Sequence, residues 1–438
     1  MKYIHLITLF VLVVSLSSRG NAADEFERPP IDYSRGTPDN AISRLQGMLD
    51  SGELTLNYEP RFGYLPALLQ ALQIPRESQM LVFSKTSLQL RRITPRTPRA
   101  IYFNDDVYLG YCHAGDVLEI SVADSNLGTV FYTLDQEARD SIQFVRHTDN
   151  CLICHSSSRT EGVPGHLVRS LFVESTGQPI FAAGSYTVDH TTPFAQRWGG
   201  WYVTGTHGTQ THLGNLVVEG RQVPQPVNNE AGQNVTDLST RILTTNYLTP
   251  HSDLVALMLL EHQAFVHNRI TKANFAARQA LHYQRTLNAA LGEAEENRLD
   301  STTRRINSAA EDLLDALLMV DEAELAAPLR GTSGFAEAFE KIGPRDDRQR
   351  SLRDLDLSRR MFKYPCSYLI YSSSFDGLPE VIHEHLWLRL WEILTGRDTS
   401  PKYAHLSTQD RTAILEILVQ TKPGLPDYWQ QVAEPLSR

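Results

Sequence analysis

The stretch that decides the fold is AIYFNDDVYLGYCHAGDVLEISVADSNLGTVFYT, residues 100–133. Short runs of β-branched and aromatic residues alternate in it with turn residues, and this pattern predicts antiparallel strands. We expect strands at 100–103, 107–111, 117–122 and 129–133. Asn104-Asp105-Asp106 and Ser125-Asn126-Leu127-Gly128 supply turn residues between neighbouring runs. The stretch therefore predicts a β-rich domain, which we extend over residues 96–245.

The segments on either side of this domain show helical spacing. Before it, residues 23–95 begin with a polar strap rich in proline and continue with short helices expected at 40–49 and 65–72. After it, Ser252-Asp253 can cap a long helix that runs towards Gly292. Further helices are expected at 302–327, 381–394 and 408–420. We predict an α+β fold, with the β-rich domain followed by a helical domain over residues 246–438.

A C-x-x-C-H motif lies inside the β-rich domain, at Cys151-Leu152-Ile153-Cys154-His155. Two thiols on one turn can each form a thioether with a porphyrin vinyl group, and the adjacent imidazole can hold the iron. The motif therefore predicts one covalently bound c-type haem. Cys151 and Cys154 are the expected attachment residues, and His155 is the expected proximal iron ligand.

Three other readings of the motif make demands that the sequence can be checked against. A structural zinc site needs four ligands, usually from two close pairs, and this chain has no second C-x-x-C. A thioredoxin-like redox pair belongs between a strand and a helix of a βαβ unit, whereas this motif is followed by the polar run Ser156-Ser157-Ser158-Arg159. A disulfide between Cys151 and Cys154 would close a very small and strained loop. The haem reading meets its demands better than these.

The N-terminus has the layout of a cleaved secretory signal over residues 1–22. Lys2 precedes the apolar segment 4–16, and small residues follow at Gly20-Asn21-Ala22. An uncleaved anchor is the alternative, and no later segment is long and apolar enough to span a membrane. Because c-type haem is attached outside the cytoplasmic membrane in bacteria, both signals indicate a periplasmic or otherwise exported protein.

Charge limits the partners. The 438-residue chain is 41% hydrophobic and 21% charged, with a net charge of −10 that becomes −12 once residues 1–22, with Lys2 and Arg19, are removed. Such a chain is not expected to bind nucleic acid. The negative field of the chain favours a basic redox partner protein or a small-molecule substrate instead.

The sixth iron ligand is left open by the sequence. No methionine lies between His155 and Met258, so the short methionine loop of many electron-transfer cytochromes is missing. We expect bis-histidine or five-coordinate iron, with His190 or His207 as the distal group. The other candidates for this position are His212, His262 and Met258.

Other residues with possible chemistry gather around Asp189–Phe194, Arg197–Trp201 and His207. Histidine and arginine near a haem can polarise a bound oxygen species, and the alternative is a rigid loop in which the histidines only brace the tryptophans. Cys112 and Cys366 are expected either to pair in an oxidising compartment or to be two separate buried thiols.

Several motifs together resemble a family of uncharacterised exported bacterial proteins with a single C-x-x-C-H motif. They are Ala100–Asp105, the C-x-x-C-H motif, Gly162–Gly165, Asp189–Phe194, Arg197–Gly205 and Tyr368–Ser372, which span most of the mature chain. The resemblance implies a haem-binding protein with a cytochrome c domain, and it implies no specific activity. By motif, only Cys151, Cys154 and His155 carry over.

The expected function is electron transfer by an exported monohaem c-type cytochrome. A periplasmic haem enzyme of peroxidase type is the first alternative, because an electron carrier needs far less chain than this to enclose one haem. A haem-based sensor is the second. The three differ in whether the iron reacts with peroxide, binds small gases or only changes oxidation state.

Overall fold

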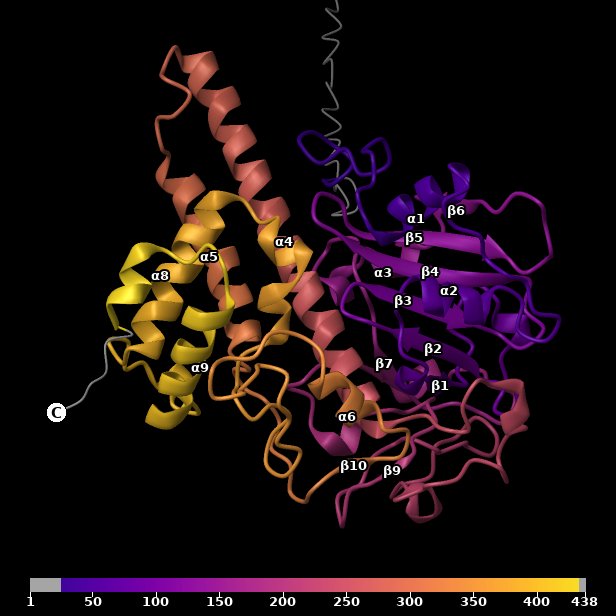
Figure 1. The fold of residues 1–438 in the computed structure, drawn as a ribbon. Helices are drawn as coiled ribbons and strands as arrows, with labels where there is room; N and C mark the ends of the chain where they lie inside the picture. Colours follow the sequence, from indigo (N-terminus) through magenta and orange to yellow (C-terminus); the bar gives the residue numbers. More distant parts are fainter. Residues whose placement is uncertain (1–24, 433–438) are drawn as a thin grey trace, which may run out of the picture.

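A six-stranded antiparallel sheet dominates the N-terminal half of the computed structural model, which describes residues 25–432 (Figure 1). The signal sequence predicted for residues 1–22 lies outside the described residues. The strands follow one another in space in the order in which they occur in the chain. They are β1 (Met80–Val82), β2 (Arg99–Phe103), β3 (Val107–Tyr111), β4 (Val117–Asp124), β5 (Gly128–Asp135) and β6 (Phe144–His147).

The turns that order this sheet come from the predicted residues. The Asn104 side-chain oxygen accepts from the amides of Asp106 (3.1 Å) and Val107 (2.9 Å), which closes the turn between β2 and β3. The Asp124 carboxylate does the same for Asn126 (2.9 Å) and Leu127 (3.0 Å). Both are turns in which a short polar side chain replaces a backbone acceptor. The four predicted strands are thereby confirmed as β2 to β5.

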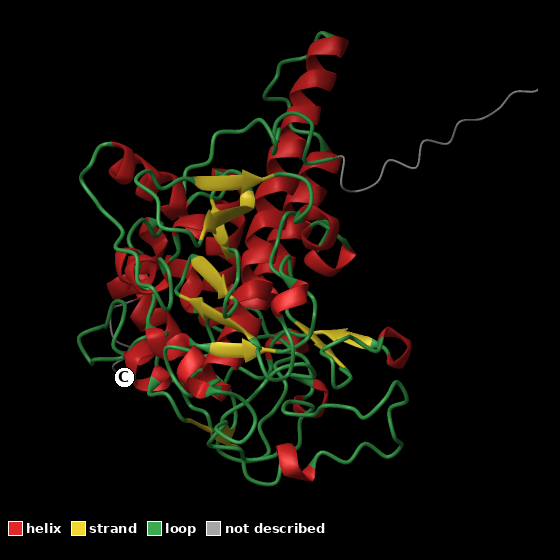
Figure 2. Cartoon of the chain, turned by 90° about the vertical axis from the view of Figure 1, so that its right-hand side faces the viewer, coloured by secondary structure: helices red, strands yellow, loops and turns green. Residues whose placement is uncertain are grey.

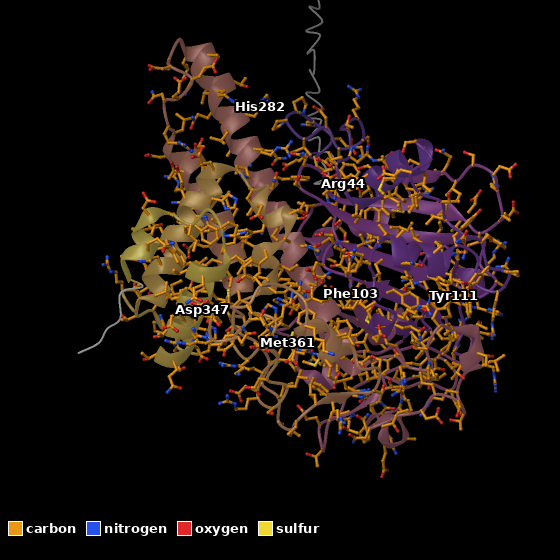
Figure 3. All side chains as sticks on the ribbon, viewed as in Figure 1. Arg44, Phe103, Tyr111, His282, Asp347 and Met361 are labelled. Atoms are coloured by element: carbon orange, nitrogen blue, oxygen red, sulfur yellow. The ribbon has the colours of Figure 1, made fainter. Side chains whose placement is uncertain are left out.

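The two faces of the sheet have different coverings. On one face Leu118, Ile120 and Val122 belong to a buried cluster that includes residues of α1 (Ala41–Asp50) and α2 (Leu65–Ala71). On the other face the ring of Phe103, labelled in Figure 3, lies 5.5 Å from that of Phe335 in α6 (Phe335–Glu340). This second face shares its core with the helical half of the molecule.

The helix α4 (Leu254–Leu291) runs between the sheet and the other helices (Figure 1). Its cap is the predicted one, since the Asp253 carboxylate accepts from the amides of Val255 (2.8 Å) and Ala256 (3.2 Å). The helix ends at Gly292, whose φ of 71° requires the left-handed region. Its first turns, from Leu254 to Leu260, are buried on all sides, as expected for a helix between two layers.

Three further helices form a bundle on the side of α4 away from the sheet. They are α5 (Asp300–Leu317), α8 (Glu380–Leu394) and α9 (Thr408–Thr421). The short helix α7 (Ser373–Asp376) contacts both α4 and β4. α5 ends well before the predicted residue 327, because Met319 and Asp321 adopt left-handed backbone angles (φ 57° and 59°) that a helix cannot contain. Helices α8 and α9 match their predicted ranges closely.

Shorter elements complete an α+β fold, which confirms the predicted class. They are α3 (Leu152–His155), the hairpin of β7 (Arg169–Leu171) and β8 (Ser185–Thr187), and the pair of β9 (Gly205–Thr206) and β10 (Arg330–Gly331). Figure 2 shows the strands stacked in front of the helices. Strand β1 comes from the segment 23–95, for which we expected only a strap and short helices. Within residues 25–432, no helix is long and apolar enough to cross a membrane.

Candidate functional site

The C-x-x-C-H motif forms α3, a single helical turn beside the sheet (Figure 1). The His155 amide donates to the Cys151 carbonyl (3.0 Å), which places both cysteines and the histidine on that turn. Neither Cys151, which is half-buried, nor Cys154, which is exposed, forms a disulfide. Ile153, between them, is 78% exposed. The thiol of Cys154 is therefore open to a group that approaches from solvent, whereas Cys151 is partly covered and burial raises the pKa of its thiol to about 11.

The imidazole of His155 is held at one nitrogen only. Its Nδ1 lies 2.9 Å from the Gly165 carbonyl oxygen, to which it donates, and the Gly165 amide donates to the His155 carbonyl (2.8 Å). No residue in the range 25–432 forms a hydrogen bond with Nε2. Burial lowers the pKa of His155, against the opposing effect of the bond to Gly165, so the ring is neutral near pH 7. A neutral imidazole with its proton on Nδ1 presents the Nε2 lone pair to a metal.

Helix α4 positions the loop that holds His155. The side-chain amide of Asn268 accepts from the His166 amide (2.8 Å) and donates to the His166 carbonyl (2.8 Å). A Cβ atom on Gly165 would lie 2.3 Å from the Asn268 Oδ1 atom. Only glycine allows this close approach. The sequence Gly162-Val163-Pro164-Gly165 therefore has a structural role next to the motif that sequence reasoning did not assign.

The sheet supplies the floor beneath α3. The ring of Phe131 on β5 lies 4.9 Å from the ring of His155. Thr133, two residues after Phe131 on β5, has its side chain on the same face of the sheet and pairs with Glu119 of β4. The Glu119 carboxylate forms an ion pair with Arg99 (2.7 Å). Paired and diagonal neighbours on one sheet face lie roughly 5 and 8 Å apart. The Arg99–Glu119 pair, with both side chains 17% exposed, is therefore a charged group close to His155.

Behind His155 lies a group of buried aromatic and imidazole rings. The rings of Tyr108 and His166 are 4.0 Å apart, and the Tyr108 hydroxyl lies 2.9 Å from Nδ1 of His267. The Nε2 atoms of His166 and His267 are buried without a hydrogen-bond partner in the described residues. Sequence reasoning did not select His166 as a candidate for the distal position. Its position directly after Gly165 is the signal that could have singled it out.

The predicted distal groups His190 and His262 lie in a different, fully buried network. Their Nδ1 atoms are 3.1 Å apart, and Nε2 of His262 lies 2.7 Å from the Ser367 hydroxyl. Burial lowers the pKa of His190 to about 4, so this ring is neutral. Among the described residues, no hydrogen bond or ring contact joins either histidine to α3. The structure brings these two residues together, but not with His155.

The same network contains a buried ion pair. Arg197 donates to Glu261 (3.0 Å) and to the carbonyls of Thr192 (2.8 Å) and His190 (3.0 Å), while the Arg197 and Glu261 side chains are 2% and 0% exposed. Burial raises the pKa of Glu261 to about 8, and the Arg197 charge opposes this shift. Each of the three guanidinium nitrogens of Arg197 thus donates a hydrogen bond to a partner inside the protein.

The remaining candidates for the distal position are also enclosed. Nε2 of His207 accepts from the Asn234 amide (3.0 Å), and Nδ1 of His212 accepts from the Gly214 amide (3.0 Å). The ring of His212 lies 5.1 Å from that of Trp198. Met258 is 2% exposed within the apolar core. In this part of the molecule the histidines brace the loop that carries Trp198.

The two other cysteines are separate buried thiols in the structure. Neither Cys112 nor Cys366 is in a disulfide, and burial raises the pKa of each thiol to about 12. The sequence left open a disulfide between Cys112 and Cys366 or two separate thiols, and the structure shows two separate thiols. A buried thiol with a raised pKa is a poor nucleophile.

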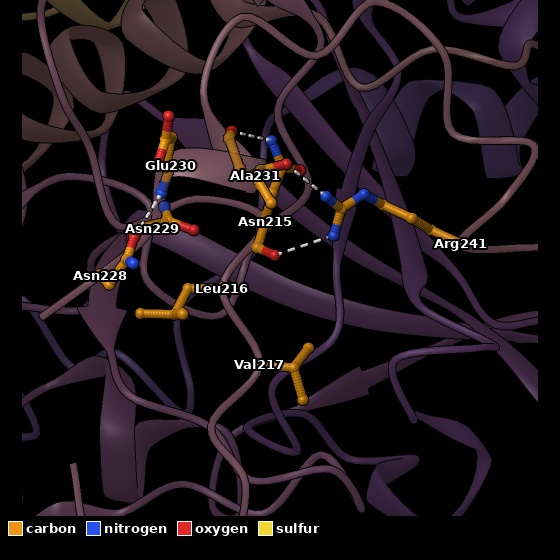
Figure 4. Close-up of a pocket in the computed structure, with 9 residues that line it drawn as sticks. Asn215, Leu216, Val217, Asn228, Asn229, Glu230, Ala231 and Arg241 are labelled. Atoms are coloured by element: carbon orange, nitrogen blue, oxygen red, sulfur yellow. Dashed lines mark hydrogen bonds between the residues drawn. The ribbon is translucent and has the colours of Figure 1, made fainter. Parts of the chain in front are cut away.

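The surface also contains a pocket of about 670 Å³ (Figure 4). It is lined mainly by residues 215–217 and 228–232 together with Arg241. The Arg241 guanidinium donates to the carbonyls of Asn215 (3.1 Å) and Ala231 (2.8 Å), as the dashed lines in Figure 4 mark. This cation is occupied by the backbone, and none of the lining residues is a histidine or a cysteine.

The residues of α3 are those that a covalently attached haem needs. Two free thiols can each add to a vinyl group, so that a sulfur–carbon bond forms and the thiol proton passes to the other vinyl carbon. Within residues 25–432, no group of three or more histidine, cysteine, aspartate and glutamate side chains is placed to hold a metal ion. A haem does not depend on such a group, since the porphyrin nitrogens supply the ligands in the plane of the iron.

Comparisons of the chain with protein-family models, curated proteins and solved structures find no match.

Proposed function

We propose that this protein is an exported monohaem c-type cytochrome that takes part in electron transfer. Cys151 and Cys154 would form the thioether bonds, and Nε2 of His155 would bind the iron. The observation that carries the proposal is the bond from Nδ1 of His155 to the Gly165 carbonyl (2.9 Å), which leaves Nε2 free on the turn that bears both thiols. Histidine ligands of metals characteristically donate their other ring nitrogen in this way.

The residues around α3 have distinct roles in this proposal. The Gly165 carbonyl fixes the tautomer and the orientation of His155, and Asn268 fixes the loop that carries this carbonyl. Phe131 packs against the imidazole ring and limits its rotation. When bound, the haem supplies reversible one-electron chemistry at its iron. The chain supplies the axial nitrogen, the orientation and the charges nearby.

Export is part of the proposal. Its support is the sequence of residues 1–22, where Lys2, an apolar segment and small residues occur in the order of a secretory signal. We propose a periplasmic or otherwise exported location, where covalent haem attachment takes place. The partner would be another redox protein, and a small-molecule substrate is the alternative.

A haem enzyme of peroxidase type is the second candidate, and one observation favours it. The Arg99–Glu119 pair lies close to His155 and is still reached by solvent. Charged groups beside an iron-binding imidazole alter how strongly that ligand donates electrons to the iron, and this donation affects the reactivity of the iron towards an oxygen species. These groups give the site more chemistry than a simple carrier needs.

The first experiment is expression with a c-type haem maturation system. The intact protein should gain the mass of one haem, and the haem stain should survive denaturing electrophoresis. Rapid mixing of the haem protein with hydrogen peroxide then separates the two functions, because only an enzyme should react quickly and consume peroxide over many cycles. A protein without added haem mass under these conditions would rule out both.

A further inference from the structure

Two arginines meet next to the motif without a carboxylate partner. Nη1 of Arg159 and Nη2 of Arg169 donate to the same Ser185 hydroxyl oxygen, at 3.1 and 2.8 Å. Within residues 25–432, neither arginine forms an ion pair. Arg159 follows Cys154 closely in the chain, and Arg169 belongs to β7, which pairs with the β8 strand that carries Ser185. Two guanidinium groups are thereby held together, with their charges uncompensated.

Apolar side chains are exposed near these two cations. Phe181 is 59% exposed, and the Arg169 guanidinium lies over its ring, 5.4 Å from the ring centre. Ile153, on the turn of the motif, is 78% exposed. Tyr186 follows Ser185 on β8 and therefore belongs to the opposite face of the hairpin. Exposed apolar residues next to unpaired cations are typical of an interaction site. We call Ile153, Arg159, Arg169, Phe181 and Ser185 the α3 patch.

The charge of the α3 patch differs from that of the whole chain. The protein carries a net charge of −10, while the patch contains two arginines and no acidic residue. A local positive surface on an acidic protein orients an approaching acidic partner, because both the attraction at the patch and the repulsion elsewhere favour the same approach. An apolar centre beside charged groups matches the usual composition of a protein interface.

We propose that the α3 patch is the docking surface for an acidic redox protein, a partner that presents carboxylates around an apolar centre. This inference rests on the proposed function, since the thiols of Cys151 and Cys154 mark the edge of the haem nearest to the patch. A partner bound at the patch would therefore lie close to the residues that would hold the haem. The reaction moves one electron between the iron of this protein and the partner's redox centre, with no bond made or broken.

Small charged oxidants test the patch before any partner is known. In the experiment, the reduced haem protein gives one electron to ferricyanide, which becomes ferrocyanide, or to tris(phenanthroline)cobalt(III), which becomes its cobalt(II) form. Arg159→Glu should slow the reaction with the anionic ferricyanide about tenfold at low ionic strength and speed the reaction with the cationic cobalt complex. Added salt should remove both effects.

Matched variants separate the patch from the overall charge. Arg330→Glu makes the same change of charge on β10, in the lower part of Figure 1, and should leave both rates nearly unchanged. Arg159→Lys keeps the charge and should behave like the parent protein. Arg159 is exposed, so its substitution should not disturb folding. Arg169→Gln, at a half-buried position, provides a second test once its circular dichroism spectrum matches that of the parent.

Two further probes decide which occupant the surface takes. Polyglutamate should slow the ferricyanide reaction of the parent protein, but not that of Arg159→Glu. Vesicles of phosphatidylglycerol should not retain the protein, whereas retention lost in Phe181→Ser would overturn the proposal in favour of a membrane surface. In Arg169→Gln, a changed midpoint potential together with an unchanged ratio of the ferricyanide and cobalt rates would indicate that the arginines bind the haem carboxylates. That result would also overturn the docking proposal.

The failure of this inference differs from the failure of the proposed function. A protein with no covalent haem refutes the proposed function and the docking surface together. A protein with covalent haem whose two rates do not depend on Arg159 refutes the docking surface alone. Equal effects of Arg159→Glu and Arg330→Glu would also refute it, because they would trace the rates to net charge.

Discussion

The molecule contains two regions rich in histidine and arginine, and they differ in what they leave free. At α3, His155 has one engaged ring nitrogen, the two cysteine thiols are unpaired, and solvent reaches the turn. In the buried network, the rings of His190 and His262 form a hydrogen bond with each other, and Arg197 donates hydrogen bonds to Glu261 and to two backbone carbonyls. Both regions hold residue types suited to catalysis. The network also leaves Nε2 of His190 without a partner in the described residues, but that atom is buried, whereas α3 is reached by solvent and carries two thiols.

The difference shows why residue types alone are a weak guide to chemistry. Burying a polar atom without a hydrogen-bond partner costs free energy. The polar groups of a dense polar segment therefore often bond to one another inside the fold and are not free to bind a ligand. The segment from Asp189 to His212 is the densest in the sequence, yet its groups mostly hold Trp198 in a left-handed backbone conformation (φ 67°) between two short elements. The plainer segment at α3 remains open to a ligand.

The largest effect expected from this comparison is the loss of the cofactor. Cys151→Ser combined with Cys154→Ser should abolish covalent haem attachment, because no thiol remains on α3. His190→Ala and His207→Ala should keep the covalent haem and its absorption spectrum, since both rings are buried and neither contacts α3 among the described residues. Haem staining after denaturing electrophoresis and visible spectra measure these outcomes. A changed ferric spectrum in either histidine variant would restore that residue as the distal ligand expected from the sequence.

The next effect concerns the two ion pairs. At a pH above the pKa of Glu261, Arg197→Ala leaves the Glu261 carboxylate buried without its cation and should lower the free energy of unfolding by about 3–5 kcal/mol. Arg99→Ala breaks a pair that solvent still reaches and should cost about 1 kcal/mol. Urea unfolding followed by circular dichroism compares the two. Equal losses would contradict the distinction between a structural network and an open site.

The pH dependence of stability tests the enclosure of the histidines. Burial lowers the pKa of His212 and His267 to about 3 and that of His190 to about 4, so these rings stay neutral in the folded state while the unfolded chain takes up protons below its ordinary value of 6.5. Their contribution to stability is therefore present above about pH 6.5 and is lost as the pH falls.

Three carboxyls oppose this trend. Burial raises the pKa of Glu261 to about 8, that of Glu322 to about 7 and that of Asp106 to about 6, so all three stabilise the folded state as the pH falls. Burial also lowers the pKa of His166 and His262, so the imidazoles outnumber the carboxyls. We expect a net loss on the order of a few kcal/mol between pH 7 and pH 5. Thermal unfolding at both pH values measures it, and greater stability at pH 5 would contradict the neutral state of the histidines.

The smallest effect is expected behind His155. Asn268→Ala removes both bonds to the His166 backbone and should loosen the Gly165 carbonyl that orients the imidazole. We expect covalent haem to be retained, with a measurable shift of the midpoint potential, because the bond to Nδ1 tunes the basicity of the metal-binding nitrogen. Asn288→Ala, another buried asparagine on α4 that bonds loop carbonyls, is the control for general destabilisation. The same shift in both variants would remove the special role of Asn268.

Much of the fold could be predicted because its signals are local. The alternation in residues 100–133 predicted four strands, and Asp253 predicted the start of α4, since turn residues and helix caps act over a few positions. The end of α5 was predicted too late, because its left-handed residues Met319 and Asp321 carry no glycine signal. The strand β1 was missed because it is only three residues long and fully buried.

The motif at Cys151, Cys154 and His155 was determined by the sequence alone, since spacing on one turn suffices to bring these groups together. Only the tertiary structure decided what surrounds it. The partner of Nδ1 of His155 is a backbone carbonyl, which carries no residue-type signal, and Asn268 reaches the loop from a helix far along the chain. The separation of His190 and His207 from α3 is likewise a result of packing between sheet and helices. Contacts between distant segments depend on how whole layers fit together, and no short stretch of sequence encodes them.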